Sequence, residues 1–173
     1  HWCLVDPGRR VVAADDELER SEAACVASGS TTTVRSQDAA EADLLRQARR
    51  AAHWALERLG DVKMEDVGVP RSRVPDMLRA VEAIAAKHAV RIGTFGHAGD
   101  GNLHPNFIFD RDDPRAEELT ELARADLYRA AIALGGTVTA EHGVGLSRRS
   151  ALVEQVGPDV IGVMRSIKDA LDP

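Results

Sequence analysis

A glycine-rich loop between two apolar runs constrains the fold of this chain more than any other feature. The runs cover residues 90–95 and 103–109, and the loop at residues 96–102 reads Gly-His-Ala-Gly-Asp-Gly-Asn. Strand-like runs joined by a short glycine-rich loop are typical of a β-hairpin. Because the strands of a hairpin are antiparallel, a doubly wound parallel sheet is disfavoured.

Helical and strand-like segments alternate through the rest of the sequence. Apolar spacing with start and stop signals predicts helices at residues 15–27, 37–59, 74–86, 114–134, 150–156 and 159–171. Short β-prone segments predict strands at residues 2–5, 31–34, 64–69 and 137–139. Arg148 and Arg149 are expected at the solvated start of a helix. This order favours an α+β fold of ferredoxin-like type, with helices covering one face of a mainly antiparallel sheet.

Composition narrows the class of protein. The 173 residues are 44% hydrophobic and carry a formal net charge of −6, which fits one folded domain and argues against broad nucleic-acid binding. No apolar run approaches the roughly 18 residues that a membrane-spanning helix needs. Cys3 and Cys25 are too few for a disulfide framework and favour the reducing cytoplasm. The chain starts at His1 and stops directly after a helical pattern, so we expect an excised part of a longer protein.

Two histidines frame the glycine loop, and a second glycine-rich loop carries a glutamate. His97 and His104 can converge, because glycines permit a tight, concave connection between the strands. Glu141 is the best candidate for a third ligand, and two histidines with one carboxylate suit Zn²⁺ or Mn²⁺ with positions open for substrate. Two alternatives stay open: a metal-dependent hydrolase that activates water, and a metal-free binding or interaction module in which the ferredoxin-like layers expose a ligand groove.

The two glycine loops together resemble a known family. Residues 96–104 read Gly-His-Ala-Gly-Asp-Gly-Asn-Leu-His, and residues 135–145 read Gly-Gly-Thr-Val-Thr-Ala-Glu-His-Gly-Val-Gly. Both look like signatures of the C-terminal domain of FAD-linked oxidases, the group of D-lactate dehydrogenases, glycolate oxidases and D-2-hydroxyglutarate dehydrogenases in the vanillyl-alcohol oxidase superfamily. Residues 66–75 and 167–173 support the resemblance, which covers nearly the whole chain.

The resemblance implies roles for particular residues. The expected positions are the metal ligands His97, His104 and Glu141, the catalytic base His142, the substrate contacts Arg49 and Asn106, and the flavin contacts Gly99 and Asn102. An imidazole can accept a hydroxyl proton near neutral pH, and an arginine fork suits a carboxylate. Relatives selective for a second carboxylate carry Lys and Thr where this chain has Met64 and His53, which favours lactate or glycolate.

The resemblance also implies cofactors and partners. Residues 1–173 would form the substrate and cap domain of an FAD-dependent D-2-hydroxy-acid dehydrogenase, which passes a hydride to flavin N5. FAD would be held mainly by another domain of the parent chain, so the separate chain is expected to be colourless and inactive. An electron-acceptor protein or a quinone is a further expected partner. The expected location is the cytoplasm, with peripheral attachment to the inner membrane left open.

Overall fold

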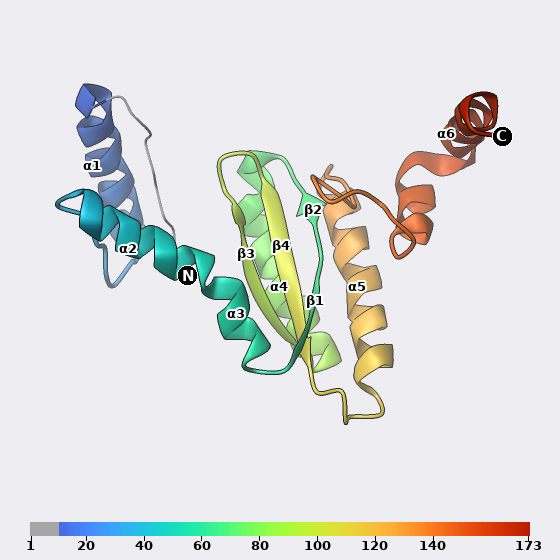
Figure 1. Ribbon diagram of the computed structural model, residues 1–173, viewed down its shortest axis with the longest axis horizontal. Helices are drawn as coiled ribbons and strands as arrows, with labels where there is room; N and C mark the ends of the chain where they lie inside the picture. The colour runs from blue at the N-terminus through green and yellow to red at the C-terminus, as the bar shows by residue number, and fades with distance from the viewer. Residues whose placement is uncertain (1–10) are drawn as a thin grey trace. The chain divides into compact units, whose positions relative to one another are not determined.

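The chain divides into two compact units, His1–Trp54 and Ala55–Pro173. The structure, a computed structural model, describes residues 11–173 (Figure 1). The strand predicted at residues 2–5 and Cys3 lie outside the described residues.

Helices make up most of the first unit. They are α1 (Val11–Ala27), α2 (Ala39–Arg50) and α3 (Ala52–Glu57), the last of which continues into the second unit. The Asp38 carboxylate caps α2 by accepting hydrogen bonds from the N–H groups of Ala40 and Glu41 at 2.8 and 2.9 Å. The single helix predicted at residues 37–59 is wrong, because a turn at Ala51 separates α2 from α3. Apolar spacing runs on across a one-residue break, so the pattern could not reveal it.

The strand predicted at residues 31–34 is also wrong. These residues form an irregular connection between α1 and α2, in which the Thr33 hydroxyl donates to the Glu22 carboxylate at 2.7 Å. β-Branched residues favour strands mainly through packing against neighbouring strands. The described part of the first unit contains no strand, so residues 31–34 have no sheet to join there.

An antiparallel sheet with β4 (Asn102–Phe109) at its centre forms the middle of the second unit. β3 (Arg91–His97) pairs with one edge of β4, while β1 (Asp61–Met64) and β2 (Val67–Gly68) follow each other along the other edge. All of these pairings are antiparallel. The predicted hairpin at residues 90–109 is therefore confirmed.

The strand predicted at residues 64–69 is split in two, because Glu65 and Asp66 separate β1 from β2. The β-prone segment at residues 137–139 contributes one antiparallel bridge, between Thr137 and Gly68, rather than a strand. We count this bridge as a residual fourth strand at one edge of the sheet. Next to it come β1 and β2, which share one position, then β4, and β3 forms the other edge. That order is ferredoxin-like, and the predicted α+β fold is confirmed.

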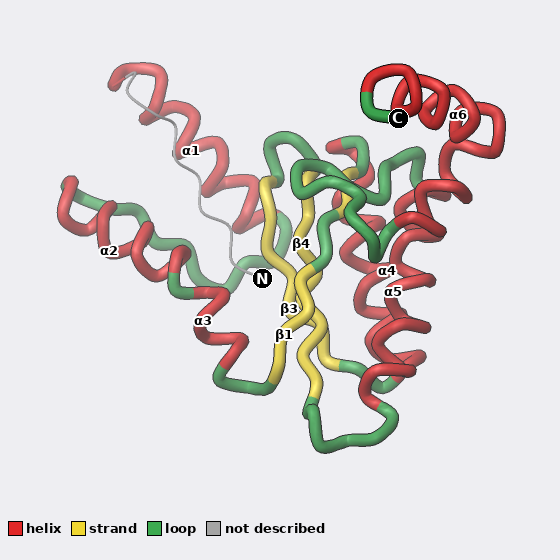
Figure 2. The backbone as a smooth tube through the Cα atoms, turned by 45° about the vertical axis from the view of Figure 1, so that its right-hand side comes forward, coloured by secondary structure: helices red, strands yellow, loops and turns green. Residues whose placement is uncertain are grey.

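Two long helices cover one face of the sheet. α4 (Val74–His88) and α5 (Ala116–Ala133) run side by side against it (Figure 2). Both were predicted, with ends that differ by at most two residues. The buried core between helices and sheet includes Val67, Met77, Val81, Leu103, Phe107, Ala123 and Leu127.

The last helix, α6 (Arg149–Leu171), is interrupted at Gly157, whose φ of 79° is not helical. This agrees with the two separate helices predicted at residues 150–156 and 159–171. Within residues 11–173, no helix combines the length and the apolar character that crossing a bilayer requires.

Candidate functional site

Alternation along β4 places polar side chains on the sheet face opposite the helices. Successive side chains of a strand point to opposite faces. Leu103 and Phe107 belong to the core beside α4 and α5, so His104 lies on the other face. The hairpin register sets His97 of β3 opposite Asn102 of β4, and His97 therefore shares that face. The hairpin thus brings the two predicted histidines together.

The glycine loop is tight at two of its three glycines. A β-carbon at Gly101, where φ is +82°, would lie 1.9 Å from the Val69 carbonyl oxygen, and one at Gly96 would lie 2.3 Å from the Asn102 carbonyl oxygen. No atom lies within 4 Å of a β-carbon placed at Gly99. The close approach expected of the glycines therefore applies at Gly96 and Gly101, and Gly99 faces open space.

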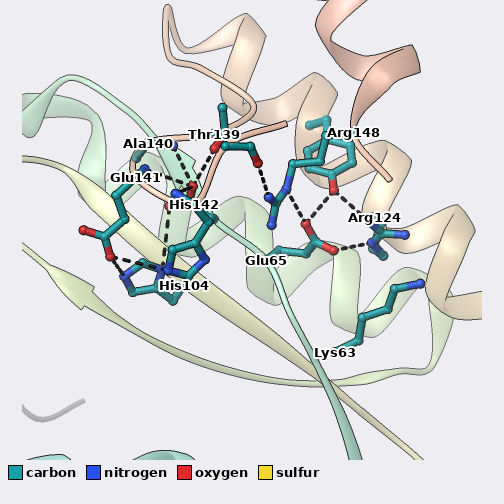
Figure 3. Close-up of polar contacts among 12 residues, drawn as sticks. Lys63, Glu65, His104, Arg124, Thr139, Ala140, Glu141, His142 and Arg148 are labelled. Carbon is teal, nitrogen blue, oxygen red and sulfur yellow. Dashed lines mark hydrogen bonds and ion pairs between the residues drawn. The ribbon is translucent and has the colours of Figure 1, made fainter. Parts of the chain in front are cut away.

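One carboxylate oxygen lies at the centre of the site. Oε1 of Glu141 is 3.2 Å from Nε2 of His104, 3.5 Å from Nε2 of His142 and 3.9 Å from Nε2 of His97. The His104 ring stacks on the His142 ring at 5.0 Å between centroids and meets the His97 ring edge-on at 5.5 Å. We call these four residues the histidine–glutamate cluster; Figure 3 shows Glu141 reaching toward His104.

The cluster is buried on one side and accessible on the other. The His104 side chain is 5% exposed, whereas those of His97, His142 and Glu141 are 39–50% exposed. Burial lowers the pKa of His104 below its ordinary value, and the neighbouring His142 adds to the effect. A lowered pKa favours the neutral imidazole, which is the form that binds a metal ion.

The donor atoms of the cluster fit a divalent metal ion. Those of His97, His104 and Glu141 all lie within 4.8 Å of one another. Two imidazole nitrogens and a carboxylate oxygen suit Zn²⁺ or Mn²⁺, whose ligands lie about 2 Å from the ion, so shifts of about 1 Å would bring all three to ligand distance. The exposed side of the cluster leaves room for further ligands.

Asp66 supports the loop that carries Glu141 and His142. Its Oδ2 accepts hydrogen bonds from the Thr139 hydroxyl and from the backbone N–H groups of Ala140, Glu141 and His142, at 2.7 to 3.1 Å. Burial alone would raise the pKa of Asp66, but these hydrogen bonds outweigh it and lower the pKa below its ordinary value. Asp66 is therefore a fixed anion under the second glycine loop.

Glu65 holds the same loop from the other side. Its carboxylate accepts hydrogen bonds from Arg124 and Tyr128 of α5 and from Nε of Arg148, the last at 3.0 Å (Figure 3). Arg148 in turn donates to the Gly143 carbonyl oxygen at 2.6 Å. Arg148 is 8% exposed, so the expectation of solvent exposure is wrong for this residue, and its guanidinium neutralises a buried carboxylate. Arg149 begins α6 at an exposed position, as expected. The only sequence signal was a pair of carboxylates interrupting an apolar strand.

The other predicted contacts lie in different surroundings. Asn106 is fully buried, and its amide NH₂ donates to the carbonyl oxygens of Gly93 and His104 at 3.1 and 2.7 Å. Its Oδ1 is buried and has no hydrogen-bond partner. Asn102 is 6% exposed and also has an unpartnered Oδ1. Arg49 is exposed in the last turn of α2, in the first unit. The roles of all three residues remain predictions.

An open groove of about 510 Å³ has Glu141 and residues at the residual fourth strand in its lining. Its polar lining includes Asp100, Asn102 and Glu141, and residues 135–137 form another part of the lining. The groove touches the cluster through Glu141 and does not include the histidines. It is therefore an approach to the cluster rather than a pocket around it.

The sequence as a whole matches a known family. The model of the family described as FAD linked oxidases, C-terminal domain, matches residues 3–173, and the chain belongs to that family.

Particular members of this family are similar to the chain over most of its length. The chain is 41% identical over 171 residues to the glycolate oxidase subunit GlcD of Bacillus subtilis (strain 168), a match that covers 98% of this chain and 36% of the relative. It is 36% identical over 137 residues to the mitochondrial D-lactate dehydrogenase (cytochrome) of Kluyveromyces lactis, covering 75% of this chain and 23% of that protein. It is 29% identical over 163 residues to GlcD of Escherichia coli (strain K12), a match that covers 91% of this chain and 32% of that protein. The chain thus spans about a third or less of the length of these curated relatives.

Proposed function

We propose that this chain is the substrate- and metal-binding domain of an FAD-dependent D-2-hydroxy-acid dehydrogenase that acts on D-lactate or glycolate. The observation that carries the proposal is the cluster, in which one oxygen of Glu141 lies 3.2 to 3.9 Å from three imidazole nitrogens. Membership of the FAD-linked oxidase family and the names of the relatives support the substrate class. In this proposal FAD is held mainly by another domain of the parent chain, and an acceptor protein or quinone removes the electrons in the cytoplasm.

His97, His104 and Glu141 would hold a divalent metal ion, Zn²⁺ or Mn²⁺. Such an ion supplies Lewis-acid polarisation of the substrate hydroxyl and carboxylate oxygens, while FAD supplies the hydride acceptor. The lowered pKa of buried His104 favours a neutral ring with a nitrogen lone pair for ligation, and the Glu141 carboxylate lies 3.2 Å from Nε2 of that ring. The half-exposed side of the cluster is where a small hydroxy acid would enter.

His142 would accept the proton of the substrate hydroxyl. Its ring is stacked on His104 and its Nε2 lies 3.5 Å from Glu141, so it is held at the edge of the cluster while its side chain stays 39% exposed. A base must lie within hydrogen-bond reach of the proton it removes, which this edge position allows. Arg49 would bind the substrate carboxylate through its planar fork, Asn106 would contribute a polar contact, and Gly99 and Asn102 would border the flavin.

Zinc titration of the purified chain tests the metal site. We expect about one Zn²⁺ per chain and no stoichiometric binding to the double variant His97→Ala/His104→Ala, because two of three protein ligands are then missing. His88→Ala is the matched control, since it removes an imidazole that pairs with Asp126 outside the cluster. A wild-type chain that binds neither Zn²⁺ nor Mn²⁺ would contradict the proposed metal centre.

Kinetics of the parent protein separate the proposed roles of His142 and Arg49. His142→Ala should lower kcat by about 10² to 10⁴ with a modest change in KM, as loss of a general base does. Arg49→Ala should mainly raise KM, because it removes a contact made in both the ground state and the transition state. If both variants changed only KM, the two roles would be wrongly assigned. Flavin-independent hydrolysis by the zinc-loaded chain would instead support the hydrolase alternative.

A further inference from the structure

Asp66 lies between two halves of the cluster that come from distant parts of the chain. It belongs to the two-residue break between β1 and β2 and is fully buried. One of its carboxylate oxygens faces His104 of β4, and the other faces the loop that carries Glu141 and His142. Its two oxygens therefore have different surroundings.

Oδ2 is saturated by the loop. It accepts from the Thr139 hydroxyl at 2.7 Å and from the N–H groups of Ala140, Glu141 and His142 at 2.8, 3.1 and 2.9 Å. These four part-buried donors favour an acceptor at this position, because a donor that loses its partner away from water is costly. Whatever replaces Asp66 must present an acceptor to the loop.

Oδ1 faces a nitrogen that also lacks a partner. It lies 3.7 Å from Nδ1 of His104, and both atoms are buried without any hydrogen bond. Buried polar groups are nearly always paired, and a shift of somewhat less than 1 Å would make this separation an ordinary N–H···O hydrogen bond. A carboxylate can only accept, so the proton in such a bond must sit on Nδ1 of His104.

We propose that Asp66 is a positioning residue that sets the tautomer of His104 for metal binding. With the proton held on Nδ1, the lone pair of the neutral ring is on Nε2, the nitrogen that lies 3.2 Å from Glu141 Oε1. A carboxylate that accepts the ring N–H of a histidine ligand, on the nitrogen away from the metal, fixes the ring orientation and makes the ligand more basic. The same side chain thereby holds His104 and the Glu141–His142 loop in one arrangement. This inference rests on the proposed function, in which the Nε2 lone pair of His104 binds the metal ion.

A second metal ion is the competing interpretation. Donor atoms of Asp66, His104 and His142 also lie within 4.8 Å of one another. An ion at that position would need the lone pair of His104 Nδ1, so the neutral ring could not also offer Nε2 to the first site. Stoichiometry and the tautomer of His104 therefore distinguish the two interpretations.

Asp66→Asn is the decisive variant, because asparagine keeps the shape and changes one oxygen into a donor. The four loop donors select its carbonyl oxygen for the Oδ2 position, which turns the NH₂ group toward His104 Nδ1. The proton of the neutral ring then belongs on Nε2, where it blocks the metal lone pair. Thr139→Val is the matched control, because it removes one donor to Oδ2 and leaves the Oδ1 side intact.

The experiment reads the tautomer in the metal-free chain and zinc affinity separately. Long-range ¹H–¹⁵N NMR of the histidine rings, with the His104 signals assigned by their loss in His104→Ala, should show Nδ1–H in the wild type and in Thr139→Val, and Nε2–H in Asp66→Asn. Zinc affinity should fall about 10- to 100-fold in Asp66→Asn and far less in Thr139→Val. Urea unfolding of each variant shows that the comparison is made between folded proteins.

Several outcomes would overturn the inference. An Nε2–H tautomer in the folded wild type would do so even if Asp66→Asn fails to fold. An unchanged His104 tautomer in Asp66→Asn, or equal loss of zinc affinity in Thr139→Val, would mean that Asp66 acts only through the loop. Two zinc ions per wild-type chain and one in Asp66→Asn would favour a second metal site. Absence of any zinc binding to the wild type contradicts the proposed metal centre, while the tautomer, which is read without metal, still decides whether Asp66 positions the His104 ring.

Discussion

Ala89 is strained by its backbone. Within residues 11–173 it is the only non-glycine residue with a positive φ, at φ 54° and ψ 36°, and it ends α4 in the left-handed conformation. Glycine adopts this conformation without steric cost. We therefore expect Ala89→Gly to raise the free energy of unfolding by about 0.5 to 1 kcal/mol, measured by urea denaturation.

The control for Ala89 lies three residues earlier. Ala86→Gly, at an exposed position inside α4, should have the opposite sign and cost about 1 kcal/mol, because the backbone there is helical. If both variants were destabilised alike, the left-handed end of α4 would not be strained.

Individual residues also show which parts of the site a sequence can reveal. His97, His104 and Glu141 were predicted to converge because their glycine loops are local signals, and the structure brings their side-chain atoms together. Asp66 and Arg148 were not predicted to support them. Asp66 has partners more than seventy residues away in the chain, and Arg148 pairs with Glu65 at a similar separation. No local pattern encodes such a pairing.

At the scale of elements, Asp126 clamps the end of α4 to α5. Its Oδ2 accepts hydrogen bonds at 2.7 Å from Lys87 Nζ and from His88 Nε2, and these contacts lower the pKa of Asp126 to about 2. A lowered pKa in the folded state means that the stabilisation is complete above about pH 4 and is lost as the pH falls toward 2.

Asp126→Asn should reveal this dependence. We expect it to lower the free energy of unfolding by about 1 kcal/mol at pH 7, a value that allows for the partial exposure of the clamp, and to leave it nearly unchanged at pH 2. Asp112→Asn, at an exposed position between β4 and α5, should have little effect at either pH. A difference between wild type and Asp126→Asn that persisted at pH 2 would show that the clamp acts through packing instead of charge.

Elements were predictable where their signals are local. The hairpin and the two covering helices combine glycine punctuation or amphipathic spacing with a buried face, and each was predicted. The failures share a cause. The turn at Ala51, the irregular residues 31–34 and the break at Glu65 depend on what neighbouring segments offer, and a pattern within one segment does not contain that information.

At the scale of the whole molecule, the second unit contains the buried core. Every side chain of the core cluster lies between Val67 and Ala151, and none of the side chains described in residues 16–54 is buried. We therefore expect a chain that begins at Ala52, and so keeps α3 intact, to unfold cooperatively with a Tm within about 3 °C of the wild type.

Thermal unfolding followed by circular dichroism checks this expectation. The helical signal should fall by the share of α1 and α2, while the transition itself should stay as sharp as in the wild type. A chain starting at Ala52 that melts gradually, or many degrees lower, would show that residues 1–51 contribute to the core of the second unit.

The hydrogen bonds to Asp66 have a consequence for hydrogen–deuterium exchange. Residues 139–142 form a loop, yet the amide N–H groups of Ala140, Glu141 and His142 donate hydrogen bonds to the carboxylate of Asp66, which is fully buried. Such amides exchange only when the bond opens, and opening here would expose Asp66 from within the sheet. These amides should therefore exchange as slowly as those of the sheet itself. A ligand that arrives at this segment meets a backbone that folding has already ordered, and its binding should change the exchange of these amides very little.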